Sequence, residues 1–213
     1  MLAAYTFNTE YRPELTPHRP SLRLLEGGRF QPGDYAPVLV EEQGSLRLRF
    51  FRWGLQPRWD QPARRMPHLG FAPAEQLFQQ PAYQRPVRQQ RCLIPVDGYY
   101  ARLGGKGQAY KVARPDGQTF CLGGIFDTYQ QADGSLLQAF ALVTAPAPAA
   151  LRPLGLQMPL VLTAAQETSW IQSNAPLPQI QHLSFHPAHH LLRGYPLHEL
   201  TLTSKDAFEQ VAA

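Results

Sequence analysis

The chain has 213 residues, which is long enough for one large domain with a sizeable core and short for two. It is 44% hydrophobic and 17% charged and contains 21 prolines, a composition that favours a β-rich protein over a helical bundle. The formal net charge is +4, and neither a run of 18 apolar residues nor a secretory leader pattern occurs, so a cytoplasmic protein that does not span a membrane is expected.

Strand patterns dominate the first half of the chain. Residues 3–8 (AAYTFN) alternate, and residues 37–55 (PVLVEEQGSLRLRFFRWGL) predict a hairpin that turns at Gly44. In this hairpin the alternation places Arg47 and Arg49 on the solvent face, opposite Phe50. Residues 60–73 indicate an irregular loop, and residues 74–87 at most a short helix broken at Pro81 and Pro86.

The second half continues with strands and two helical segments. Strands are predicted within 91–103, 109–129, 136–145 and 158–163, with tight turns at 115–118 and 133–134. Residues 147–155 predict a short helix, residues 163–173 a helix capped by Thr163, and residues 197–203 a last strand. These elements predict an α+β fold in which residues 1–213 form a single domain with an antiparallel, barrel-like sheet core and short flanking helices.

Cysteines and histidines give little support to redox or metal chemistry. Cys92 and Cys121 each lie inside an apolar segment, which is typical of buried structural thiols in a reducing compartment. The segment HLSFHPAHHLL holds four histidines, but Pro187 interrupts any regular helix that would present two of them on one face, and no acidic residue is near. No metal or other cofactor is expected, and the histidines are interpreted as loop residues.

Tryptophan and arginine form a more informative group. FRWGLQPRW and the two arginines that follow it combine aromatic faces with guanidinium groups, the side chains that bind single-stranded nucleic acid. For Trp53 alone, a core position at the end of a strand is an equally good interpretation. The residues predicted to contact nucleic acid are Arg52, Trp53, Pro57, Arg58, Trp59, Arg64, Arg65 and Glu75.

Five blocks of the sequence, in order, resemble one known family. They are FRWGLQPRW, RCLIPVDGYY, GGIFD, LVTAPA and GLQMPLVL, and the late segment FHPAHHLL adds a sixth likeness. The blocks resemble those of the SRAP (SOS response-associated peptidase) family, whose members are single-domain α+β proteins with a barrel-like core. The resemblance implies a protein related to those that shield abasic sites in single-stranded DNA.

The family mechanism implied by this resemblance is covalent. An amino-terminal cysteine, exposed by removal of the initiator methionine, offers its amine and thiol to the opened sugar and forms a thiazolidine, assisted by an Asn, a Glu and a His. Where the family begins MCGR, this chain begins MLAA, so Leu2 stands at the position of the nucleophile. A leucine side chain cannot form a thiazolidine.

The assisting positions also differ from the family pattern. Matching the family's Asn-containing block places Phe71 at the Asn and Glu75 at a retained Glu, with Pro73 in place of an Arg. Ala101 stands where the family has its catalytic Glu, and Gly155 where it has its His, with Gln157 in place of a second Arg. The resemblance therefore predicts that Leu2, Phe71, Ala101 and Gly155 mark lost catalytic positions.

Two functions from different classes follow. The first is noncovalent binding of single-stranded or junction DNA, or another interaction role, without crosslinking or self-processing. The alternative is a repurposed small-ligand protein or enzyme, in which Phe71, Ala101 and Gly155 line an apolar pocket at the former site.

Overall fold

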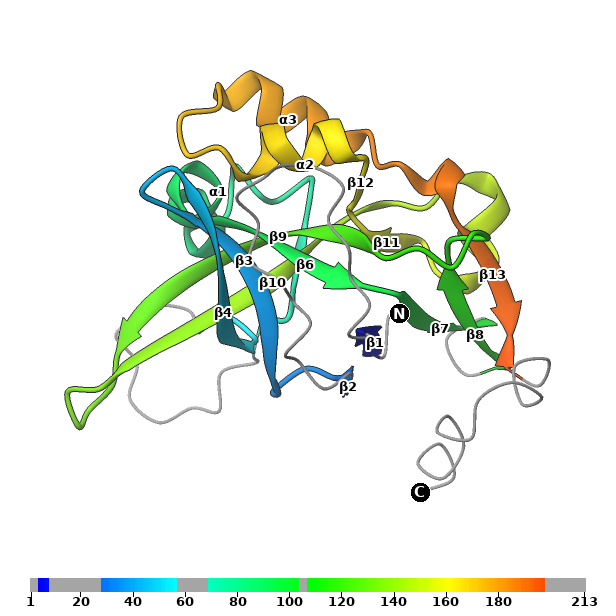
Figure 1. Ribbon diagram of the computed structural model, residues 1–213, viewed down its shortest axis with the longest axis horizontal. Helices are drawn as coiled ribbons and strands as arrows, with labels where there is room; N and C mark the ends of the chain where they lie inside the picture. The colour runs from blue at the N-terminus through cyan, green and yellow to red at the C-terminus, as the bar shows by residue number, and fades with distance from the viewer. Residues whose placement is uncertain (1–3, 8–27, 57–68, 104–106, 198–213) are drawn as a thin grey trace.

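The computed structural model describes residues 4–7, 28–56, 69–103 and 107–197, which form two β-sheets with short helices on one side (Figure 1). Its strands are β1 (Ala4–Phe7), β2 (Gly28–Phe30), β3 (Tyr35–Glu42), β4 (Ser45–Trp53), β5 (Phe71–Pro73), β6 (Arg91–Val96), β7 (Gly98–Arg102), β8 (Ala109–Ala113), β9 (Phe120–Gln130), β10 (Leu136–Pro146), β11 (Gln157–Pro159), β12 (Val161–Leu162) and β13 (Arg193–Pro196). Its helices are α1 (Pro81–Gln89), α2 (Ala164–Ile171) and α3 (Leu177–Phe185), with 3₁₀ helices at Ala149–Leu154 and His189–Leu191. The strand expected at 197–203 lies almost wholly outside the described residues.

The larger sheet closes on itself as a five-stranded barrel. Its pairings run from β10 through β4, β3, β6 and β9 and return to β10. Four of the five pairings are antiparallel, as the sequence predicts, whereas β4 and β10 run parallel and pair Ala139 with Arg52 and Phe140 with Trp53. The predicted α+β fold with a barrel-like core and short helices is confirmed, and the one parallel pairing, which closes the ring, makes the barrel mixed rather than wholly antiparallel.

The second sheet has the strand order β13-β8-β7-β1-β2 and is joined to the barrel where β6 leads into β7. Asp97 separates these two strands, and its backbone N–H donates to the Thr6 carbonyl on β1 at 3.0 Å. A Cβ atom at Gly98 would lie 2.6 Å from the Lys111 side chain and 3.0 Å from the Val112 carbonyl. The glycine therefore allows β7 and β8 to approach closely where the chain passes between the sheets.

Two turns match their sequence signals. Gln43 and Gly44 connect β3 to β4 with φ angles of 53° and 75°, as a two-residue hairpin requires. Asp133 and Gly134 lie in the turn between β9 and β10, where the Asp133 carboxylate accepts from Ser135. The turn at 115–118 also forms, but it connects β8 to β9, which belong to different sheets.

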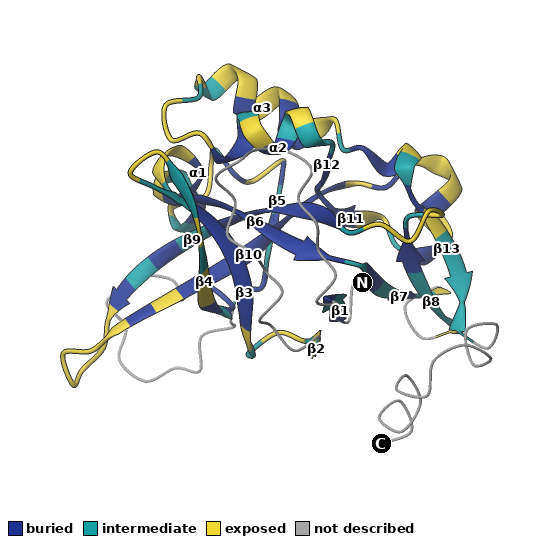
Figure 2. Cartoon of the chain, viewed as in Figure 1, coloured by how far each residue is buried: buried dark blue, intermediate teal, exposed yellow. Residues whose placement is uncertain are grey.

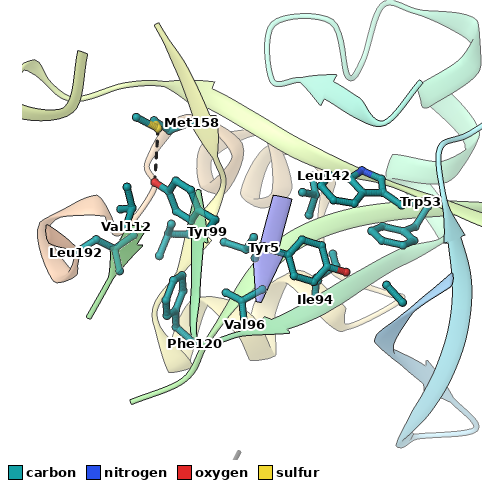
Figure 3. Close-up of a cluster of buried hydrophobic side chains, with 14 of the residues drawn as sticks. Tyr5, Trp53, Ile94, Val96, Tyr99, Val112, Phe120, Leu142, Met158 and Leu192 are labelled. Carbon is teal, nitrogen blue, oxygen red and sulfur yellow. Dashed lines mark hydrogen bonds between the residues drawn. The ribbon is translucent and has the colours of Figure 1, made fainter. Parts of the chain in front are cut away.

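The core consists of two apolar clusters that occupy the two faces of the barrel wall. The first fills the space between the sheets and includes Tyr5, Trp53 and Tyr99 (Figure 3). The second lies under the helices and includes Leu77, Trp170 and Leu183. Between them, a Cβ at Gly124 would lie 2.4 Å from Ile94 Cδ1, so this glycine permits β6 and β9 to pack closely (Figure 2 shows these strands largely buried).

Local chemistry explains the helix boundaries. Thr163 caps α2 as predicted: its hydroxyl accepts from the Gln166 N–H, while the Gln166 side chain accepts from the Thr163 N–H. The expectation of a helix broken at Pro81 and Pro86 is wrong, since α1 begins at Pro81 and continues through Pro86. Proline is favourable in the first helical turn, and Pro86 removes one internal hydrogen bond without ending the helix.

Arg91, the first residue of the RCLIPVDGYY block, has a structural role. It is 4% exposed, and its guanidinium donates to the carbonyls of Val87 at 2.7 Å, Trp170 at 2.7 Å and Gln172. It thereby ties β6 to the ends of α1 and α2. None of the helices in the described part of the chain has the length and apolar character of a membrane span.

Candidate functional site

The structure brings the FRWGLQPRW block and the block around Phe71 together. The Trp53 indole N–H donates to the Gly70 carbonyl at 2.8 Å, and the Phe71 ring meets Trp53 edge-on at 5.6 Å. Phe71 pairs with Leu142 on β10, and the Tyr83 hydroxyl donates to its carbonyl at 3.2 Å. Phe71, at the position of the family's assisting Asn, thus packs against the first core cluster.

Trp53 is a core residue. Its side chain is 0% exposed and contacts Tyr5 and Phe140 at ring-centroid distances of 5.1 and 6.1 Å. A ring enclosed in this way offers no free face to a base. Of the two interpretations that the sequence leaves open for Trp53, the structure selects the core position.

Ala101 is also part of the core. It lies on β7 on the same face as Tyr99, is 2% exposed, and belongs to the cluster that contains Val112, Leu154 and Leu192. Figure 3 shows the Tyr99 hydroxyl pointing to Met158, with an O to S distance of 3.5 Å. The position that the resemblance matches to a carboxylate of the family is therefore enclosed by apolar side chains.

Gly155, Gln157 and Glu75 come from two segments that β10 brings together. Thr144 on β10 pairs with Pro73 of β5 on one side and Pro159 of β11 on the other. Across this junction the Gln157 side-chain amide donates to the Glu75 carboxylate at 3.0 Å. Gly155, which follows the 3₁₀ helix Ala149–Leu154, presents no side chain to the site.

These positions hold little that could act chemically. Phe71, Ala101 and Gly155 can neither accept nor donate a proton through a side chain, and Leu2 lies outside the described residues. The Cys92 thiol is 0% exposed, and burial raises its pKa far above the ordinary range, so it is not a nucleophile at neutral pH.

The predicted nucleic-acid residues are only partly described. Arg52 is half-buried, and its Nε donates to the Gly33 carbonyl at 3.4 Å. Trp53 is buried, Glu75 is exposed, and the others lie outside the described residues: Pro57, Arg58, Trp59, Arg64 and Arg65.

Two exposed aromatic residues beside Arg52 were missed by the sequence analysis. Tyr35, which is 58% exposed, pairs directly with Arg52 across β3 and β4, and Phe50, which is 51% exposed, lies two residues before it on the same face. Arg47 and Arg49 are exposed as predicted, but the expected burial of Phe50 is wrong, because Phe51 points into the core instead. A double Phe carries no signal that tells which ring is buried.

The histidine segment is arranged differently from the expectation. The His182 and His186 rings stack with their centroids 3.9 Å apart. His186 lies just beyond α3, and its Nδ1 atom, 2.8 Å from the His182 carbonyl oxygen, holds its ring beside His182. The inference that Pro187 keeps these two rings apart is therefore wrong. Within the ranges that the structure describes, no three His, Cys, Asp or Glu side chains gather in a way that could hold a metal ion.

His189 differs from its neighbours because it is buried. Its Nε2 donates to the Pro159 carbonyl at 2.9 Å, while its Nδ1 has no partner among the described residues. Burial, and secondarily His190, lower the pKa of His189 below its ordinary value. The neutral ring therefore links the segment after α3 to β11.

This burial predicts a loss of stability in mild acid. The unfolded chain binds a proton at His189 near its ordinary pKa of about 6.5, whereas the folded chain binds it only at lower pH, so the free energy of unfolding falls as pH drops through this window. Urea titrations at pH 7.5 and pH 5 should show the fall, and H189Q should reduce it. An equal fall in H189Q would assign the effect to other groups.

Comparisons with known proteins agree with the fold and the blocks. Residues 20–201 match the family described as SOS response associated peptidase (SRAP). The abasic site processing protein YoqW of Bacillus subtilis is 25% identical to this chain over 158 residues, and the match covers 70% of each chain. An abasic site processing protein of Saccharomyces cerevisiae is 32% identical over 143 residues, and that match covers 65% of this chain and 37% of the yeast protein. A crystal structure of a protein from Bordetella bronchiseptica has a TM-score of 0.72 at 18% identity, covering 91% of this chain and 98% of that chain. With the family match spanning most of its length, the chain belongs to the SRAP family.

Proposed function

We propose that this SRAP-family chain binds single-stranded or junction DNA noncovalently and carries out neither abasic-site crosslinking nor self-processing. The observation that carries the binding proposal is the face formed by the exposed rings of Tyr35 and Phe50 beside the half-buried Arg52. This face lies directly before the segment that holds Arg58, Trp59, Arg64 and Arg65.

The absence of crosslinking is argued from four positions. Leu2 supplies no thiol, and Phe71 supplies no amide that could orient a sugar. Ala101 replaces a carboxylate inside an apolar cluster, and Gly155 replaces an imidazole with a hydrogen atom. Each change removes a different role in the family's reaction, so no single remaining group restores it.

Noncovalent binding is supported by the chemistry of the exposed face. Aromatic rings stack on bases of any sequence, and guanidinium groups contact phosphates and stack on bases as well. The net charge of +4 favours a polyanion, and relatives are named as abasic site processing proteins. Binding of this kind weakens as the salt concentration rises.

Fluorescence anisotropy with labelled single-stranded and junction DNA at low salt tests the proposal. We expect binding by the unmodified chain, and about thirtyfold or more weaker binding by the double variant Y35A/F50A, since each of the two rings stacks on a base and each stacked base contributes about 1–3 kcal/mol. R58E and R64E should also weaken binding. R88E is the matched control, because Arg88 is exposed on α1 and its reversal changes the net charge equally.

Two results would refute noncovalent DNA binding. One is the absence of binding at low salt. The other is a loss of affinity in R58E and R64E no larger than in R88E, which would show that net charge alone acts.

A further inference from the structure

The outer face of the five-stranded sheet carries a row of aromatic and basic side chains. The register pairs Tyr100 with Lys111 and Lys111 with Tyr195, so these three residues share one face of β7, β8 and β13, while Ala4, which pairs with Tyr100 on β1, is buried. Tyr100, Lys111 and Tyr195 are half-exposed, whereas Tyr99 and Val112, on the opposite face, are buried in the core. The strands that carry these residues are labelled in Figure 1.

Arg29 extends this row onto β2. It pairs with Thr6, which pairs in turn with Gly98, and its guanidinium carbon lies 5.0 Å from the centre of the Tyr100 ring. A cation held over an aromatic ring is oriented by that ring. Arg29 thereby presents a fixed guanidinium plane that can stack on a base or contact a phosphate.

The charge of this face is positive. Its described residues include four cations, Arg29, Arg102, Lys111 and Arg193, beside one carboxylate, that of Asp97. The Asp97 carboxylate lies 3.6 Å from the Lys111 Nζ atom and also accepts a hydrogen bond from the Thr6 hydroxyl group. An excess of cations interleaved with aromatic rings complements a flexible polyanion that also has stackable bases.

We infer that this sheet face, defined by Arg29, Tyr100, Lys111 and Tyr195, is a second contact surface for single-stranded nucleic acid. The inference rests on the proposed DNA binding and assigns to it a surface apart from the Tyr35, Phe50 and Arg52 face. Tyr100 and Tyr195 are two strands apart, about 10 Å. Their rings stack on two bases of the same single-stranded nucleic acid. Lys111, which lies between them, contacts the phosphate that joins these bases instead of pairing with the Asp97 carboxylate.

Anisotropy with a fluorescein-labelled oligothymidylate, measured over a series of salt concentrations, tests this surface in the full chain. K111Q should reduce the slope of log affinity against log salt by about 0.7, the contribution of one phosphate contact to a single strand. Y195A should weaken binding about fivefold or more. The control R88Q should change neither, and urea titration shows that each variant remains folded.

The outcomes separate the sheet surface from the proposed function. If the unmodified chain binds and Y35A/F50A weakens binding while K111Q and Y195A do not, the sheet surface is refuted and DNA binding stands. If the unmodified chain binds no oligonucleotide, both the sheet surface and the proposed DNA binding are refuted. If polyglutamate binds as tightly as oligothymidylate and Y195A affects neither, the face recognises acidic polymers, and nucleic acid as its occupant is refuted.

Discussion

Replacing Ala101 by glutamate, the residue that the family has there, is expected to lower the free energy of unfolding by about 3 kcal/mol or more at neutral pH. Ala101 is 2% exposed among apolar side chains, so the new carboxyl group would lose its hydration without gaining a partner. Urea titration followed by circular dichroism measures the loss. The substitution would therefore damage the fold rather than restore a catalytic group.

The neutral variant A101Q separates the charge from the volume of the new side chain. Burial raises the pKa of a carboxyl group, so the folded A101E chain would hold a proton that the unfolded chain releases. The loss in unfolding free energy relative to the unmodified chain should therefore shrink as pH falls toward 4. A101Q should show a deficit without this pH dependence. An A101E chain as stable as the unmodified protein would contradict the burial of this position.

Truncation of Trp53 should have a comparable effect. W53A is expected to cost about 3–5 kcal/mol of unfolding free energy, since the ring is 0% exposed and its removal leaves a large cavity beside Tyr5, Phe71 and Phe140. The Gly70 carbonyl would also lose the indole N–H that donates to it. Urea titration again measures the loss.

W53F tests whether Trp53 also contacts DNA. This variant keeps much of the buried volume, so it should destabilise the fold less than W53A while leaving DNA affinity unchanged. Reduced affinity in a well-folded W53F chain would contradict the assignment of Trp53 to the core alone.

Local signals in the sequence predict much of the fold. Gly44 marks the hairpin turn and Thr163 caps its helix, because each of these features depends on neighbours a few residues away. The parallel pairing of Phe140 with Trp53 was not predicted. It joins residues distant in the chain, and no local pattern specifies that partner.

The candidate site was located by the family resemblance rather than by its own chemistry. Nothing in the composition marks Ala101, which becomes informative only because the family has a glutamate there, and the structure adds that the position is buried. The contact between Gln157 and Glu75 joins two residues that are 82 positions apart in the chain. Exposure of Tyr35 and Phe50 depends on which face of the barrel strands β3 and β4 other parts of the chain cover, and strand alternation alone does not encode this.

We propose that this SRAP-family chain has lost covalent chemistry, and incubation with abasic single-stranded DNA tests this proposal most directly. The products are separated by denaturing electrophoresis without reductant, and a short peptide with an amino-terminal cysteine serves as the positive control for the sugar aldehyde. We expect a shifted covalent band with the peptide and none with the protein. A protein–DNA band that survives denaturation would contradict the claim.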